Sequence, residues 1–185
     1  MRIHIFGASG SGTTTLSRAL AGRLGIAFLD ADDFFWEPTD PPFTTKTEIS
    51  ARKAALGAAT KAAGSWVLSG SMMEWGDFLI PEIELAVYLY LPPLIRLERL
   101  AARERARYGA RIDEGGDLRA SHLEFMAWAS RYDTGGLELR SKLSHASWAK
   151  KLTCPLVRIE GDLPLEESVA RTLDELRKSG IVRRD

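Results

Sequence analysis

Residues 6–16, FGASGSGTTTL, join a short apolar β-rich run (2–7) to the start of a predicted helix (13–25). Gly7 and Gly12 have the spacing of a phosphate-binding loop, and hydroxyl side chains follow them. Thr13 stands where the G-x-x-x-x-G-K-[ST] pattern has its lysine, and Thr14 occupies its Ser/Thr position. Such a loop binds phosphate mainly through backbone N–H groups and the helix N-terminus. The stretch therefore predicts a phosphate site that lacks the usual lysine; the alternative is a glycine-rich turn without a ligand.

Strands and helices alternate along the rest of the chain. Apolar runs predict five buried strands, at residues 2–7, 26–30, 66–70, 85–91 and 154–161. Helical periodicity with glycine and proline signals predicts the helices 13–25, 51–64, 93–109, 117–131, 137–151 and 164–180. The order predicts an α/β fold with a doubly wound parallel sheet and helices on both faces, and residues 1–185 suit a single domain.

The composition favours a cytoplasmic protein. Lysine plus arginine and aspartate plus glutamate both total 25, so no excess charge attracts nucleic acid or a lipid surface. A lone cysteine, Cys154, cannot form an internal disulfide and fits a reducing compartment. Neither a signal-peptide core nor a run of about 20 apolar residues is present, so we expect no membrane segment.

An acidic turn follows the second predicted strand. Residues 28–36, FLDADDFFW, place Asp30, Asp32 and Asp33 at the strand end, where open α/β sheets bind ligands. Carboxylates there can hold Mg²⁺ or accept a proton from an attacking hydroxyl. Asp is also a good helix N-cap, and Asp33 is the best candidate for that role.

The helix 93–109 carries a stripe of arginines at positions 96, 99, 103 and 107. A solvated helix face is one interpretation, and contact with nucleotide phosphates, helped by Arg111, is the other. Two segments, 37–48 and 108–117, are rich in proline, threonine or glycine. We expect both to be mobile loops at the edge of the scaffold.

The order of these motifs resembles the P-loop nucleoside and nucleotide kinases, among them relatives of adenylate, shikimate and gluconate kinase. The likeness rests on GASGSGTT, the strand ending in Asp-x-Asp, the strand ending SGS, RLERLAARERARYG and the strand ending EGD, and it covers nearly the whole chain. The LDADDFFW turn also resembles an adenylate kinase-like group, some of whose members are labelled topology modulation proteins. The resemblance implies a strand order of 2-3-1-4-5, an acceptor region at about 31–64 and a lid at about 108–117.

The resemblance also implies roles for individual residues. Asp30 and Asp32 match the Asp-x-Asp of shikimate kinase, with Thr14 and Asp30 on the metal and Asp32 on the acceptor. The expected nucleotide-binding residues are Gly7, Ala8, Ser9, Gly10, Ser11, Gly12, Thr13, Thr14, Thr15, Arg99, Gly161 and Asp162. The expected acceptor-binding residues are Asp32, Phe35, Trp36, Lys46, Ser69 and Gly70, with Phe34 to Trp36 forming either an apolar wall or part of the core. The expected catalytic residues are Asp32, Arg103, Arg107 and Arg111.

Two departures from the kinase pattern bear on the chemistry. Ser69 stands where adenylate kinases have an acidic residue, and no phosphate-gripping arginine follows it, which favours a hydroxyl acceptor without phosphate over a nucleoside monophosphate. Thr13 removes a positive charge from the transferring phosphoryl group, although GSGTTT also occurs in archaeal cytidylate kinase-like proteins. Arg103, Arg107, Arg111 or Lys46 would have to supply that charge.

The sequence thus predicts an ATP- and Mg²⁺-dependent kinase of a small hydroxyl-bearing molecule, which includes nucleosides and nucleotides. A nucleotide-binding sensor or slow NTPase is the first alternative, favoured by Thr13 and Ser69. A nucleic-acid-associated factor is the second, and the neutral charge without a basic–aromatic patch argues against it. The identity of the acceptor and the oligomeric state do not follow from the sequence.

Overall fold

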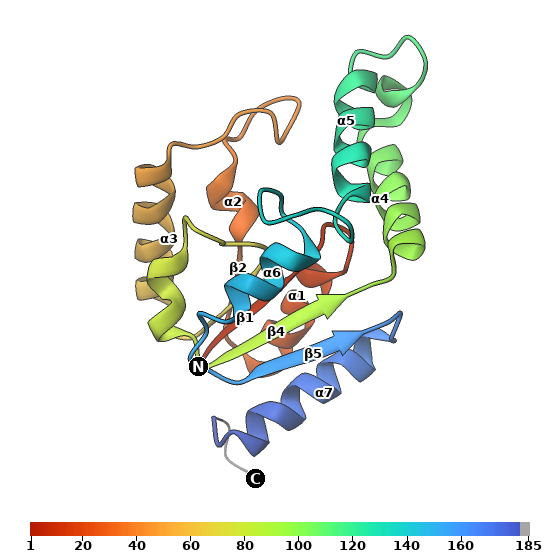
Figure 1. Ribbon diagram of the computed structural model, residues 1–185. Coiled ribbons are helices and arrows are strands. Elements are labelled where there is room, and N and C mark those ends of the chain that lie inside the picture. The colour runs from red at the N-terminus through yellow and green to blue at the C-terminus, as the bar shows by residue number, and fades with distance from the viewer. Residues whose placement is uncertain (182–185) are drawn as a thin grey trace.

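The computed structural model describes residues 1–181 and is organised around a five-stranded sheet (Figure 1). The strands are β1 (Arg2–Gly7), β2 (Ala27–Asp30), β3 (Trp66–Ser69), β4 (Leu85–Tyr90) and β5 (Leu156–Glu160). Every neighbouring pair is parallel, and the order is β2-β3-β1-β4-β5, which confirms the predicted fold class and strand order. Among the described residues, no helix is long and apolar enough to cross a membrane.

Strand β1 shows how the sheet is buried on both faces. Ile3 and Ile5 point to one face and pack with residues of α1 (Thr13–Leu24) and α7 (Leu165–Lys178). Phe6 points to the other face and packs with residues of α3 (Ile49–Ala63), the 3-10 helix η1 (Asp77–Glu82) and α6 (Lys142–Ala149). Successive side chains of a strand alternate between faces, so an apolar run such as RIHIF fills two cores at once.

Two helices extend beyond the carboxyl ends of the strands, α4 (Pro93–Tyr108) and α5 (Arg119–Ser130), joined through the 3-10 helix η2 (Gly109–Ile112) (Figure 1). Arg96 of α4 is fully buried and donates hydrogen bonds to the Ala129 carbonyl, at 3.0 Å, and to Asp133, at 3.2 Å. Arg96 therefore fixes α4 against the end of α5. The interpretation of the whole arginine stripe as a solvated helix face is therefore wrong at Arg96.

Two local expectations are corrected. The helix expected at 137–151 covers only Lys142–Ala149, because the Ser141 and Ser144 side chains each bond the other's backbone N–H and fix the helix start. The preceding Gly135 and Gly136 also disfavour helix. After β2, the short helix α2 (Ala31–Phe35) is capped by Asp30, whose carboxylate accepts the Asp32 N–H, and not by Asp33.

Candidate functional site

The glycine loop curls tightly between β1 and α1. Gly10 and Gly12 adopt φ angles of +83° and +96°, which side-chain-bearing residues rarely adopt, and Gly12 is the N-cap of α1. A Cβ on Gly7 would come within 2.4 Å of the Leu89 carbonyl oxygen. The first N–H groups of α1 have no intrahelical acceptor, so they are available to an anion at the loop.

Three hydroxyl and carboxylate groups meet beside the loop. Thr14 Oγ1 donates to Asp30 at 3.1 Å, and the buried Ser69 hydroxyl donates to Thr14 at 3.3 Å. Burial raises the pKa of the Asp30 carboxyl, against the lowering effect of its bond from the Asp32 N–H.

These groups also bear on where a metal ion could bind. Within residues 1–181 no cluster of three or more His, Cys, Asp or Glu is arranged to bind a metal. A hydroxyl and one carboxylate nevertheless suit Mg²⁺, which commonly takes its other ligands from water and phosphate.

The loop borders a cavity of about 730 Å³, named here the loop cavity. It runs from the N-terminal end of α1 to the end of β5, where Gly161 and Asp162 lie. Arg99 lines this cavity and donates to Asp162 at 2.5 Å. The structure therefore brings Arg99, Gly161 and Asp162, which were predicted to bind the nucleotide, to the same cavity as the phosphate loop.

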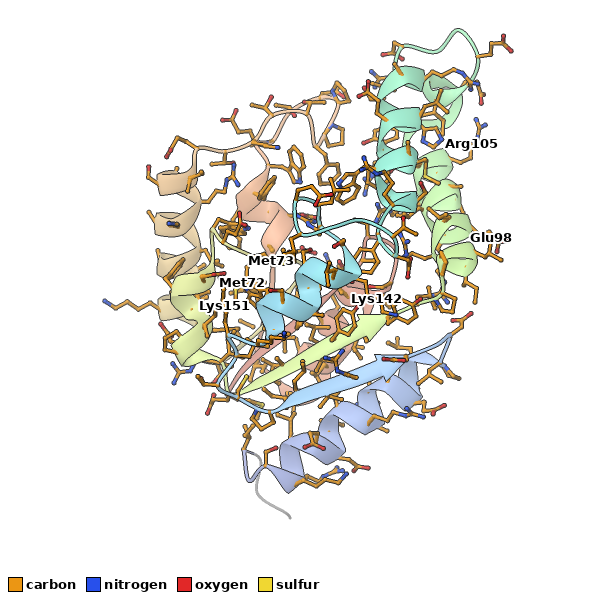
Figure 2. All side chains as sticks on the ribbon, in the orientation of Figure 1. Met72, Met73, Glu98, Arg105, Lys142 and Lys151 are labelled. Carbon is orange, nitrogen blue, oxygen red and sulfur yellow. The ribbon has the colours of Figure 1, made fainter. Side chains whose placement is uncertain are left out.

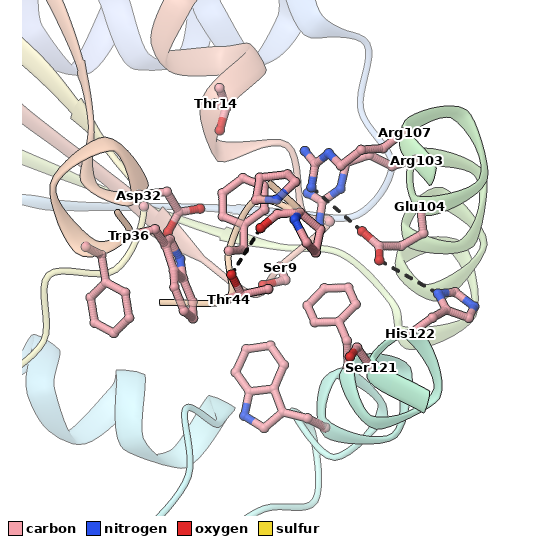
Figure 3. Close-up of a pocket in the computed structure, with 18 of the residues that line it drawn as sticks. Ser9, Thr14, Asp32, Trp36, Thr44, Arg103, Glu104, Arg107, Ser121 and His122 are labelled. Atoms are coloured by element: carbon pink, nitrogen blue, oxygen red, sulfur yellow. Dashed lines mark hydrogen bonds and ion pairs between the residues drawn. The ribbon is translucent and has the colours of Figure 1, made fainter. Parts of the chain in front are cut away.

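A second cavity of about 520 Å³, named here the aromatic cavity, also borders the loop (Figure 3). Aromatic rings line it from two directions: Phe35, Trp36 and Phe43 from the region after β2, and Phe125 and Trp128 from α5. The Phe125 and Trp128 rings are stacked, with centroids 5.9 Å apart.

The two cavities share a set of bordering residues. Those lining both are Gly10, Thr13, Thr14, Asp30, Asp32, Phe43, Arg103 and Arg107. The set contains the position of the missing lysine, two carboxylates and two guanidinium groups. A group passing from one cavity to the other would pass among these side chains.

Asp32 opens onto both cavities and its side chain is exposed there, although protein atoms surround much of its carboxyl. This enclosure raises its pKa, and the positive charges of Arg140 and then Arg103 oppose the shift. Arg140 lines the aromatic cavity. The region near Asp32 therefore combines neighbouring carboxylates with positive charge from Arg140, Arg103 and Arg107.

Residues 36–46 form a strap that leads from α2 toward α4. An antiparallel bridge between Trp36 and Lys46 closes its base. At its tip, the Phe43 ring centroid is 4.6 Å from the Arg107 guanidinium carbon, and the Tyr108 hydroxyl donates to the Pro42 carbonyl at 3.4 Å. The strap thus touches the helix that carries Arg103 and Arg107.

Some predicted site residues lie elsewhere. Ser69 is fully buried and reaches Thr14, without lining the aromatic cavity. Arg111 lines neither cavity described above and is bound by Asp117 at 2.7 Å. The segment 108–117 expected as a loop is partly the 3-10 helix η2. Lys46 and Gly70 do line the aromatic cavity, as do Asp32, Phe35 and Trp36.

The structure adds cavity residues that the sequence reasoning did not single out. These are Phe43, Glu104, Ser121, His122, Phe125, Trp128 and Arg140. No arginine follows Ser69 closely along the chain, but Arg140 lines the same cavity from the segment before α6. A Phe and a Trp three residues apart in a helix, 125 and 128, are the only sequence signal we find for this wall.

Comparison with known proteins supports a kinase-type fold. The family profile described as "AAA domain" matches residues 3–119. A Bacillus subtilis (strain 168) protein named "Uncharacterized protein YqaC" is 43% identical over 174 residues, covering 94% of this chain and 96% of the relative. A "Cytidylate kinase" of Methanocorpusculum labreanum is 30% identical over 120 residues, covering 56% of this chain and 63% of the relative.

Solved structures share the fold at low identity. A shikimate kinase from Acinetobacter baumannii in complex with shikimate aligns with a TM-score of 0.58 at 19% identity, covering 98% of this chain and 95% of that one. A shikimate kinase from Bacteroides thetaiotaomicron aligns with a TM-score of 0.56 at 20% identity, covering 95% of this chain and 98% of that one.

Proposed function

Because the chain belongs to the AAA domain family and to the superfamily of P-loop nucleoside and nucleotide kinases, we propose that it transfers phosphate from ATP to a small hydroxyl-bearing acceptor. The loop cavity would hold the nucleotide, and the aromatic cavity would hold the acceptor. Mg²⁺, bound through Thr14 and Asp30, would neutralise phosphate charge. Relatives named as kinases support the proposal.

The observation that carries this proposal is the set of residues that border both cavities. Phosphoryl transfer needs a nucleophile and a phosphate held in line, with positive charge around the group in transit. Asp32, Arg103 and Arg107 lie at that junction. A protein that only bound nucleotide would not need a second cavity opening onto the same carboxylate.

Asp32 would act on the acceptor hydroxyl. Its carboxylate accepts the hydroxyl proton as the oxygen forms a bond to the γ-phosphorus and the bond from that phosphorus to the β,γ-bridging oxygen of ATP breaks, which leaves ADP. The raised pKa of the Asp32 carboxyl makes it a better proton acceptor than an ordinary aspartate. Arg140 and Arg103 keep it ionised by opposing that shift.

Arg103 and Arg107 would supply the charge that a loop lysine provides elsewhere. Both reach the junction from α4, and Thr13 faces the same space from the loop. Fixed guanidinium groups stabilise charge on a phosphoryl group in transit without reorganisation. Arg99 and Asp162 would border the base of the nucleotide, in the loop cavity.

The test is ATP consumption by the purified protein with and without a panel of candidate acceptors. The panel includes nucleosides, nucleoside monophosphates, sugars and hydroxy acids, and product phosphorylation is verified by mass spectrometry. A kinase shows ATP consumption that an acceptor stimulates at least about tenfold, with one phosphorylated acceptor per ADP formed.

A nucleotide-binding sensor or slow NTPase is the second candidate. It is favoured by Thr13, which leaves the loop itself without a cationic side chain. Tight ATP binding with turnover that no acceptor stimulates would select this function. It would also remove the acceptor role proposed for the aromatic cavity.

A further inference from the structure

Glu104 is an unusual member of the aromatic cavity wall. It lies on α4 and is 6% exposed, although it is a carboxylate. Its carboxylate oxygens lie 3.8 Å from an Arg107 guanidinium nitrogen and 3.7 Å from His122 Nδ1. Both distances exceed that of a hydrogen bond, and within residues 1–181 no hydrogen bond to this carboxylate is formed.

A buried carboxylate without a hydrogen bond is costly to the fold. Carboxylates removed from water usually accept two or more hydrogen bonds, because their hydration is otherwise lost uncompensated. The neighbouring His122 Nδ1 is also buried without a hydrogen-bond partner. The Glu104 oxygens are not among the fully enclosed atoms without a partner, so they keep access to the aromatic cavity, where a donor group of a ligand can reach them.

The location of Glu104 defines which part of a ligand it would meet. Glu104 and His122 lie on the α4–α5 side of the cavity, across from Asp32 on the α2 side (Figure 3). Aromatic rings line the space between them from two directions. An acceptor with its reactive hydroxyl at Asp32 would therefore place its far end at Glu104, with its middle between rings.

We propose that Glu104 selects an acceptor whose far end carries an amino group on a flat nitrogen heterocycle. The heterocycle would stack against the aromatic rings, and its amino N–H would donate to the Glu104 carboxylate. This inference rests on the proposed kinase function, because the orientation is set by the hydroxyl at Asp32. It assigns Glu104 to specificity, not to the transfer step.

The experiment compares ligand pairs that differ only in that group. Cytidine and the ribonucleoside of pyrimidin-2-one form one pair, and adenosine and the ribonucleoside of purine the other; in each, a hydrogen atom replaces the amino group. Binding is measured by calorimetry for the parent protein and for Glu104→Gln, in the presence of a non-hydrolysable ATP analogue. In the parent, we expect the amino member of at least one pair to bind about tenfold or more tightly. In Glu104→Gln, that preference falls to about threefold or less, since a neutral amide accepts a hydrogen bond more weakly than a carboxylate.

Glu98→Gln is the matched control. Glu98 lies on the same helix, is exposed and points away from both cavities (Figure 2). The substitution Glu98→Gln removes the same charge from α4 at a position outside the cavity. We therefore expect this variant to prefer the amino ligand as strongly as the parent does. Thermal unfolding of all three proteins checks that they are folded.

The outcomes separate the two proposals. Equal affinity for both members of each pair in the parent, or no binding of either pair, overturns the inference, whatever Glu104→Gln does. Efficient phosphorylation of a ring-free polyol overturns it too, and leaves the kinase function standing. A Glu104-dependent amino preference without any phosphate transfer supports the recognition and removes the kinase function.

Discussion

The phosphate loop and the aromatic cavity meet at Asp32, but the loop binds through backbone groups and the cavity is lined by side chains. The loop uses one continuous segment whose glycines allow the backbone N–H groups to converge. The cavity uses side chains from α2, the strap, α4, α5 and the segment before α6. A backbone site binds whatever carries phosphate, whereas a side-chain site can be changed one residue at a time. The difference explains how one loop can serve many acceptors within a superfamily.

The largest expected effect comes from the arginines that stand between the two regions. If they replace the loop lysine, Arg103→Ala or Arg107→Ala lowers kcat about 10³-fold, as loss of an arginine finger does. Nucleotide affinity changes far less, because the backbone N–H groups remain. Steady-state kinetics and nucleotide titration measure the two effects separately.

The exposed Arg105 of the same helix is the control, since it is bound to Asp113 and points away from the cavities (Figure 2). Thr13→Lys in the affected arginine variant partly restores kcat and changes the parent little. If the effects of the two substitutions simply add, the loop position and the arginine do not share a role.

Asp32→Asn should give the next largest effect. Loss of the proton acceptor lowers kcat about 10²-fold or more, with nucleotide affinity nearly unchanged. The neighbouring Asp33→Asn serves as its control, because Asp33 lines only the loop cavity and does not cap α2. An equal loss of kcat in both variants, with folding intact, would contradict the role assigned to Asp32.

Gly10→Ala tests whether the loop depends on its backbone. A Cβ here would lie 2.8 Å from a Leu100 side-chain atom and 2.9 Å from the Arg96 carbonyl, at a positive φ. We expect a loss of about 1–3 kcal/mol in unfolding free energy together with weaker nucleotide binding. Denaturant unfolding and nucleotide titration give both values. Thr15→Ala is the control, because it changes only a side chain in the same stretch. Unchanged nucleotide affinity in Gly10→Ala together with reduced affinity in Thr15→Ala would contradict the view that the loop binds nucleotide through its backbone.

The smallest expected effect is a shift in pH dependence. Activity needs ionised Asp32, so kcat/KM is retained above the pKa of its carboxyl and falls as the pH drops through it. Arg140 lowers that pKa, so Arg140→Gln should move the acid limb of kcat/KM to higher pH. The pH–rate profiles of the parent and variant measure the shift. An acid limb that moves to lower pH, or does not move, would contradict the proposed effect of Arg140 on the pKa of Asp32.

The same contrast decides what the sequence could predict. The strand order and the loop follow from local patterns, because apolar runs and glycine spacing are written in consecutive residues. The aromatic cavity depends on long-range packing: Arg140 affects the pKa of Asp32 from the segment after α5, a helix whose end Arg96 holds against α4. Arginines 96, 99, 103 and 107 look alike as a sequence stripe. Burial of Arg96 and pairing of Arg99 with Asp162 separate them only in three dimensions.

The aromatic wall also makes the protein its own optical probe. Of the five tryptophans, Trp66, Trp75 and Trp148 are buried in the core, whereas Trp36 and Trp128 line the aromatic cavity from opposite sides. Indole emission responds to the polarity around the ring and to stacking with another chromophore. Occupancy of this cavity would therefore change the intrinsic fluorescence while the three core tryptophans provide a constant background, so ligands can be screened without a label.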